Sequence, residues 1–455
     1  MDLPAAGRTL RFVPIVFAIG CATTGHAAYD PVEPEGARAP TGDGPRLVVD
    51  EAIAKGPLLE RAAFVREVLR VNPSIESARQ AWRAAAARTR QSGVLDDPMV
   101  TVDMAPLTLG SSKARFSWDA MISQKLAWPG KLSLDEAVRS AEANAAKIDV
   151  DAALRDLALT AALLFDQYFV IARSIEINAH HVELMRAMRA AAAAQYAAGR
   201  GAAQDALQAE FELAHMEHDT VTLLSQRNVT VAQMNELLHR SPREPLPPPP
   251  TALPSPASRD PLNQAQLEAE AVDDRPDIRA ARARSRAEAA RAERAARESY
   301  PDFTVSTAYN VFWDTPEQRW TVGLTFNLPV QAGRRAGAID EANAMRAQFD
   351  ADALRIRDAA RTQVVVAIEQ LEEAEHVVRL YEARLVPVAR NEVDAAQAAF
   401  VASQAPFVSV VAAEKNLRSV ELEMQMASAD VDRRRAELDH ACGRMPGLDG
   451  AGVTP

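Results

Sequence analysis

Residues 303–328 read FTVSTAYNVFWDTPEQRWTVGLTFNL. Apolar and polar side chains alternate on both sides of a polar turn at residues 313–318, and this period of two predicts a β-hairpin. Residues 99–127 alternate in the same way and predict a second hairpin. We expect each strand to be about ten residues long, the length that a tilted strand needs to cross a bilayer.

Two hairpins supply four strands, which are too few to close a membrane barrel. Single-chain membrane barrels begin at about eight strands, and an open strand edge is untenable in lipid. Three chains together would supply twelve strands, so the strand count predicts a trimer. The alternative is that the hairpins are soluble and pack on the helices. The aromatic residues near the strand ends do not decide between the two, because they suit a membrane-interface belt and a core alike: Trp118, Phe303, Tyr309, Trp313 and Trp320.

Outside the hairpins the composition favours helices. Glycine is scarce at 19 residues, aromatic residues make up 5%, and alanine runs recur. Apolar residues between Leu154 and Ile175 are spaced alternately by three and four, as in a coiled coil, and the same rhythm returns between Val364 and Leu385. One helix from Leu132 to Ala197 would be roughly 100 Å long. Pro387 is expected to kink or interrupt the second long helix.

The two halves of the chain repeat one plan of helix, hairpin, very long helix, tight turn and helix. Pro73 and Pro276 are 203 residues apart, as are Gly130 and Gly333, and this offset predicts a tandem duplication. The predicted division is an N-terminal linker at 28–58, a first repeat at 59–240 with its hairpin at about 99–127, a proline-rich connector at 241–261, a second repeat at 262–443 with its hairpin at about 302–328, and a tail at 444–455.

The N-terminus is typical of an export signal. Arg8 and Arg11 precede a short apolar core at residues 12–20. Cleavage is expected either after residue 27 or, as in a lipoprotein, after residue 20, which would make Cys21 the lipidation site. A cysteine buried in the apolar core of the signal is the plainer interpretation of Cys21. The only other cysteine is Cys442, and no later run of about 18 apolar residues predicts a transmembrane helix.

Catalysis has no support in the sequence. The net charge of −11, with arginines interleaved among acids, argues against a nucleic-acid partner. A phosphate-binding loop, a nucleophile elbow and an HExxH motif are all absent. His215 and His218 share one helical face and could bind zinc or copper, but a solvated pair is the favoured interpretation. We therefore predict that the protein is not an enzyme and holds neither a metal nor a cofactor.

Over roughly residues 59–443 the sequence resembles the TolC-like outer-membrane efflux family. The Pro-Gly-Lys-Leu run is most similar to the CzcC and CusC branch, which serves heavy-metal pumps. The stretches that carry the resemblance are Asn72-Pro73, Trp128-Pro129-Gly130-Lys131-Leu132, Tyr196-Ala197-Ala198-Gly199, Asp205-Ala206-Leu207-Gln208-Ala209-Glu210, Asn235-Glu236-Leu237-Leu238, Arg275-Pro276-Asp277-Ile278 and Asn327-Leu328-Pro329.

The resemblance implies a mostly α fold with a small β part. Three chains would form a twelve-stranded β-barrel in the outer membrane of a Gram-negative bacterium and a twelve-helix α-barrel tunnel across the periplasm. A periplasmic adaptor (membrane fusion protein) and an inner-membrane pump of the RND type would dock at the lower end. The implied function is passive conduction of exported heavy-metal cations or drugs. A periplasmic coiled-coil adaptor or structural protein without a barrel is the alternative.

The resemblance also assigns adaptor docking and gating to two bends between helices. We expect Gly199 and Gly201 to supply a positive φ or a helix stop, and Pro406 to fix the start of the next helix. Ser403 stands where the family usually has glycine, and Ser409 and Ala412 replace acids of some members, so an acidic entrance ring is not expected. The docking residues implied are Gly199, Arg200, Gly201 and Asp205 in the first bend and Ser403, Gln404, Pro406 and Ser409 in the second.

Overall fold

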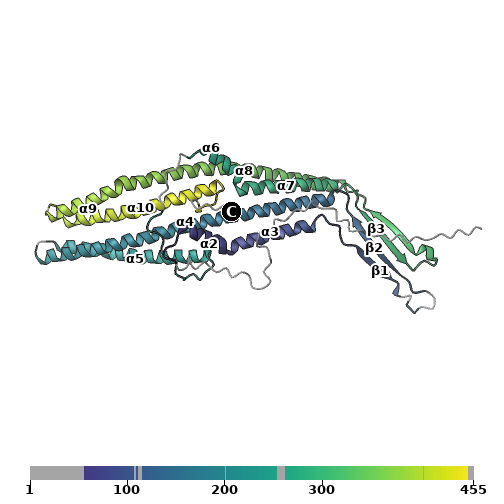
Figure 1. Cartoon of the computed structure of the whole chain (residues 1–455), viewed down its shortest axis with the longest axis horizontal. Coiled ribbons are helices and arrows are strands. Elements are labelled where there is room, and N and C mark those ends of the chain that lie inside the picture. Colours follow the sequence, from purple (N-terminus) through teal and green to yellow (C-terminus); the bar gives the residue numbers. More distant parts are fainter. Residues whose placement is uncertain are drawn as a thin grey trace, which may run out of the picture. The chain divides into compact units, whose positions relative to one another are not determined.

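A computed structural model describes residues 56–106, 109–110, 115–199, 201–253, 262–402 and 404–448 (Figure 1). The predicted export signal with Cys21 lies outside these residues, as do Arg200, Ser403 and the end of the predicted tail. Within the described part, every helix is too short or too polar to span a membrane.

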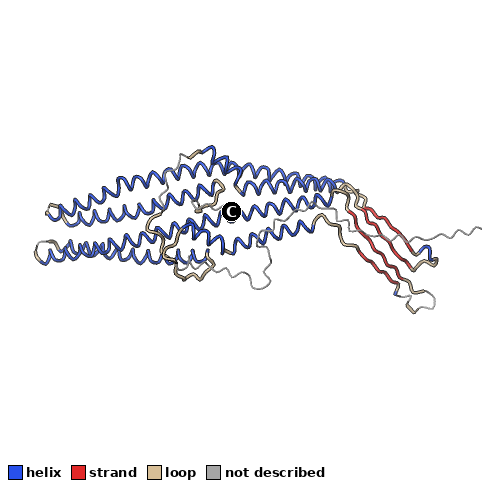
Figure 2. The backbone as a smooth tube through the Cα atoms, viewed as in Figure 1, coloured by secondary structure: helices blue, strands red, loops and turns tan. Residues whose placement is uncertain are grey.

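The two halves share one order of elements, which confirms the predicted tandem fold of long helices with a small sheet (Figure 2). The first half contains α2 (Arg61–Val71), α3 (Pro73–Gln91), β1 (Met99–Met104), β2 (Trp118–Leu126), α4 (Lys131–Ala197) and α5 (Ala203–Leu237). The second half contains α6 (Gln264–Asp274), α7 (Pro276–Arg297), β3 (Phe303–Asn310), a 3-10 turn (Pro316–Gln318), β4 (Trp320–Phe326), α8 (Ala332–Leu380), α9 (Val386–Val401) and α10 (Phe407–Ala441).

Each half opens with two helices, where the sequence pattern predicted one. The break between α2 and α3 falls at Asn72-Pro73, and the break between α6 and α7 falls at Arg275-Pro276. Proline has no N–H to continue a helix and forces the residue before it out of the helical region. Asn72 then starts the new helix, because its side chain accepts a hydrogen bond from the Ser74 N–H at 3.0 Å.

The four strands form one antiparallel sheet in the order β1-β2-β3-β4. They are six to nine residues long, so the predicted ten is too long. β3 ends at Asn310 because the Asn310 side chain accepts the Phe312 N–H at 2.8 Å and turns the chain. β4 ends before Leu328-Pro329, where the proline cannot donate to a neighbouring strand.

The helices pack along α4 and α8. α4 contacts α3, α5, α7 and α10, while α8 contacts α7 and α10. The main core lies where α2 meets α4 and α5, with Phe64 against Phe165 and Met234 close by. Ala161 and Ala162 are fully buried in this core, and their small side chains let neighbouring helices approach closely.

Pro387 interrupts the second long helix, as predicted. α8 passes into one π-helical turn at Tyr381–Leu385, and α9 then begins at Val386. The wider turn relieves the clash of the proline ring with the carbonyl of Ala383 four residues earlier. The corresponding helix of the first half, α4, runs without a break for 67 residues.

Candidate functional site

The sheet has one apolar and one polar face. Residues opposite each other in the register share a face, so Val100, Ile122 and Thr307 lie in a row with Val322 of β4. We call this surface the apolar sheet face; its other members are Val102, Met104, Trp118, Ala120, Gln124, Leu126, Phe303, Val305, Tyr309, Trp320, Leu324 and Phe326. Gln124 and Thr307 are its only polar side chains among the strand residues.

The apolar sheet face is uncovered in the single chain. Val322 on the edge strand β4 is 83% exposed, and Val100 on the opposite edge strand β1 is 69% exposed. The other face carries mainly hydroxyl, amide and charged groups, including Asp103, Asp119 and Lys125. A sheet that is apolar on one face and polar on the other suits a boundary between lipid and water.

Both edges of the sheet are open among the described residues. β1 pairs only with β2, and β4 pairs only with β3. Each outer edge therefore presents unpaired backbone N–H and C=O groups, which in lipid must find partners. Because β1 and β4 run in opposite directions, the β4 edge of one copy can join the β1 edge of another as an antiparallel pair.

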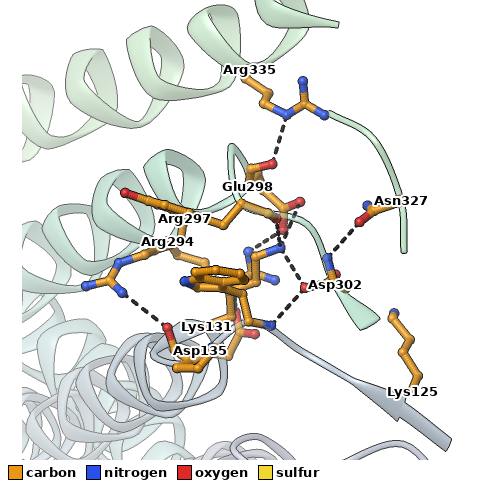
Figure 3. A network of polar contacts seen from close by, with 12 residues as sticks. Lys125, Lys131, Asp135, Arg294, Arg297, Glu298, Asp302, Asn327 and Arg335 are labelled. Atoms are coloured by element: carbon orange, nitrogen blue, oxygen red, sulfur yellow. Dashed lines mark hydrogen bonds and ion pairs between the residues drawn. The ribbon is translucent and has the colours of Figure 1, made fainter. Parts of the chain in front are cut away.

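A buried lysine fastens the sheet to the helices (Figure 3). Gly130 precedes α4 with φ of 89°, a conformation that glycine adopts without strain, and it turns the chain from β2 into the helix. Lys131 follows and is completely buried. Its Nζ lies 2.8 Å from Asp302 Oδ1 and donates to the Tyr300 carbonyl at 3.0 Å.

Asp302 gathers the bases of three strands. Its carboxylate accepts the Trp128 N–H at 3.0 Å, just after β2, and its own N–H donates to Asn327 Oδ1 at 2.7 Å, just after β4. The Trp128 ring stacks on Tyr300 at 5.1 Å between ring centres. The sequence showed the glycine and lysine as a motif but missed Asp302, whose position directly before β3 was the available signal.

Arginines of the neighbouring helices surround this junction. Arg294 of α7 pairs with Asp135 of α4 at 2.9 Å, and Arg335 of α8 donates to the Glu298 carbonyl at 2.9 Å. Arg297 donates to the Pro129 carbonyl at 3.2 Å. These contacts join α4, α7 and α8 at the end that carries the sheet.

The first bend connects α4 to α5 at the end of the helices opposite the sheet (Figure 1). Gly199 has φ of 68°, as predicted, and its N–H donates to the Tyr196 carbonyl at 2.9 Å. Gly201 does not have a positive φ, so of the two glycines only Gly199 supplies one. Glycine suits position 201 because the chain passes close to Gln195 there: a Cβ at position 201 would lie 3.1 Å from the Gln195 Cβ.

Asp205 begins α5. Its Oδ2 accepts the Ala202 N–H at 3.4 Å, which satisfies one free amide at the helix start. The side chain of Ala202 has no oxygen, so only this half of a capping box exists. Asp205 therefore has a structural role in the single chain.

The second bend connects α9 to α10. Gln404 donates its N–H to the Ala399 carbonyl at 2.8 Å, and Pro406 stands directly before the helix that begins at Phe407. Ser409 donates its N–H to the Pro406 carbonyl at 3.0 Å in the first turn. The rings of Phe400 and Phe407 lie 5.4 Å apart and hold the two helices together.

The histidine pair singled out in the sequence lies on an exposed face of α5. The rings of His215 and His218 are 6.5 Å apart, and His215 Nδ1 lies 3.7 Å from Asp219. Within the part of the chain that the structure describes, histidine, cysteine and acidic residues form no group of three or more that could hold a metal ion.

The chain thus combines helices of up to 67 residues with a four-stranded sheet whose apolar face is exposed. Comparison with curated proteins gives no match. Residues 267–444 match the family model for outer membrane efflux proteins. Among solved structures, CusC is similar with a TM-score of 0.72 and 16% identity over 85% of this chain and 93% of that chain. VceC from Vibrio cholerae is similar with a TM-score of 0.69 and 18% identity over 86% of this chain and 97% of that chain.

A membrane protein from Pseudomonas aeruginosa has the same fold, with a TM-score of 0.71 and 17% identity over 92% of this chain and 98% of that chain. The family match over residues 267–444 supports the resemblance to TolC-like outer-membrane efflux proteins, and the solved structures share the fold of this chain. The name of the matched family agrees with the predicted location in an outer membrane. This family consists of transport proteins and not of enzymes.

Proposed function

We propose that three copies of the chain close a twelve-stranded barrel, with β4 of each copy paired to β1 of the next. The carrying observation is the apolar sheet face, which is exposed on the single chain and bounded by two open edges. In a closed barrel this face meets lipid, the polar face lines the interior, and each edge finds a partner. Lipidation of Cys21 would add a second membrane anchor.

The helices of the three copies then continue the barrel as a periplasmic tunnel. α4 joins the sheet directly, through the Lys131–Asp302 pair, and ends at the first bend. We propose that both bends contact a periplasmic adaptor and an RND-type inner-membrane pump through Gly199, Arg200, Gly201 and Asp205 and through Ser403, Gln404, Pro406 and Ser409. The exported substrates would be heavy-metal cations or drugs, which pass through a conduit that supplies no energy of its own.

Cell fractionation followed by native mass determination in detergent tests this proposal. We expect the protein in the outer-membrane fraction, as a trimer that forms steady ion-conducting pores in a planar bilayer. A monomer or dimer in the soluble periplasmic fraction would contradict the barrel and favour the alternative of a periplasmic coiled-coil adaptor or structural protein. Co-purification with an adaptor, lost when the bends are altered, separately tests the assignment of the docking residues.

A further inference from the structure

A buried histidine joins the two helix pairs above their bends. The first helix pair is α4 with α5, and the second is α9 with α10. His181 of α4 is only 3% exposed, and both of its ring nitrogens face carboxylates of α10. Nε2 lies 3.2 Å from Glu421 Oε2, and Nδ1 lies 3.8 Å from Glu414 Oε2.

The hydrogen bonds at Glu414 are incomplete. Glu414 is 2% exposed, and its Oε1 accepts from Gln397 Nε2 of α9 at 3.1 Å. Its Oε2 is buried and has no hydrogen-bond partner among the described residues. A buried carboxylate oxygen without a donor costs free energy. A neutral imidazole has a single N–H, which can serve Glu421 or Glu414 but not both, whereas a protonated imidazole can serve both.

The surrounding charges leave Glu414 without another cation. Arg390 of α9 donates to Glu421 Oε1 at 3.1 Å and supports only that carboxylate. His180, the neighbour of His181 on α4, is exposed and acts on Glu414 only as a nearby charge. Burial raises the pKa of Glu414, while the hydrogen bond from His181 lowers the pKa of Glu421. Charged side chains between α10 and α5 pair with each other, Lys415 with Glu212 and Arg418 with Asp219.

We propose that His181, Glu414 and Glu421 form a proton-binding site that fastens the first helix pair to the second. A proton on this site places a positive charge between the two carboxylates, so the joined state of α4 and α10 binds a proton that the separated state releases. The contact between the two helix pairs is therefore most stable at low pH and becomes less stable as the pH rises. This site acts within one chain and does not depend on conduction.

Hydrogen exchange of the intact protein in detergent tests the site. Backbone protection would be measured at residues 178–188 and 410–421 from about pH 5.5 to about pH 8.5, after correction for the intrinsic pH dependence of exchange. For the wild type we expect protection at both segments to fall about tenfold across this range, the effect of losing one charge-assisted hydrogen bond. Protection where α7 packs on α4 should not change with pH.

Three variants separate the proton site from other causes. His181→Gln cannot gain a proton and should lose the pH response. Glu414→Gln supplies a permanent N–H toward His181 Nδ1, so it should keep both segments protected at high pH. His218→Gln, on an exposed face of α5, is the matched control and should behave as the wild type.

A wild-type response no larger than that of His181→Gln would overturn the proposal, as would a Glu414→Gln variant that loses protection at high pH like the wild type. If His181→Gln does not fold, the wild type and Glu414→Gln still decide the question, because they predict opposite behaviour at high pH.

Discussion

Replacing Val322 by lysine would place a charge in the middle of the apolar sheet face. Val322 is 83% exposed on the single chain, so the substitution disturbs no packing there. In the proposed barrel the same position faces lipid, where a lysine at the bilayer centre costs about 2–4 kcal/mol. Three copies would place three such charges in one trimer, for a total of about 6–12 kcal/mol. We expect the membrane-inserted trimer to become at least tenfold less abundant.

The matched control is Thr321→Lys, one residue earlier in β4. Thr321 is also exposed on the single chain, but it lies on the polar face of the sheet. We expect this variant to assemble like the wild type. The assay is the fraction of protein recovered as trimer from outer membranes, measured by native electrophoresis in detergent. Equal recovery of the two variants would refute the assignment of the apolar face to lipid, whether both fall or neither does.

Three further predictions test the junction and the core. Lys131→Met should lower the free energy of unfolding, measured by chemical denaturation, by about 3 kcal/mol, because Asp302 loses its buried partner. The double variant Lys131→Met with Asp302→Leu should recover much of this loss. No recovery in the double variant would count against the ion pair. Gly130→Ala should cost about 1–2 kcal/mol in the same measurement because of the positive φ, whereas Gly333→Ala, its counterpart in the second repeat, should cost nothing. Burial raises the pKa of the Asp166 carboxyl to about 6, although the salt bridge from Arg61 acts in the opposite direction. The folded chain therefore holds a proton that the unfolded chain releases, and the free energy of unfolding should fall by about 3 kcal/mol as the pH rises from about 4 to about 7. Thermal unfolding of Asp166→Asn should not show this fall.

Local patterns in the sequence were enough to predict the elements. A period of two located the strands, spacings of three and four located the long helices, and the 203-residue offset located the repeat. These patterns depend on residues close in the chain, whose geometry follows from helix and strand periodicity alone. The same reasoning placed the break at Pro387 and the positive φ of Gly199, because proline and glycine act on their own backbone.

Local signals predicted the element ends less well. The strands are shorter than expected because Asn310 and Pro329 end them through contacts that the alternation of side chains does not show. The second helix at the start of each half was missed, although Asn72-Pro73 had been noticed as a motif. Position 201 needs a small residue and not a positive φ. This need depends on how closely the Gln195 side chain approaches, which the local sequence does not show.

The tertiary structure alone decided which distant residues meet. Lys131 and Asp302 come from different repeats, 171 positions apart, yet together they fix the base of the sheet. Packing of α4 on α10 buries His181 between two glutamates that lie 233 and 240 positions later in the chain. Periodicity assigns a residue to a face of its own element, whereas the partner of that face depends on how separate elements pack, and no local pattern in this chain encodes that choice.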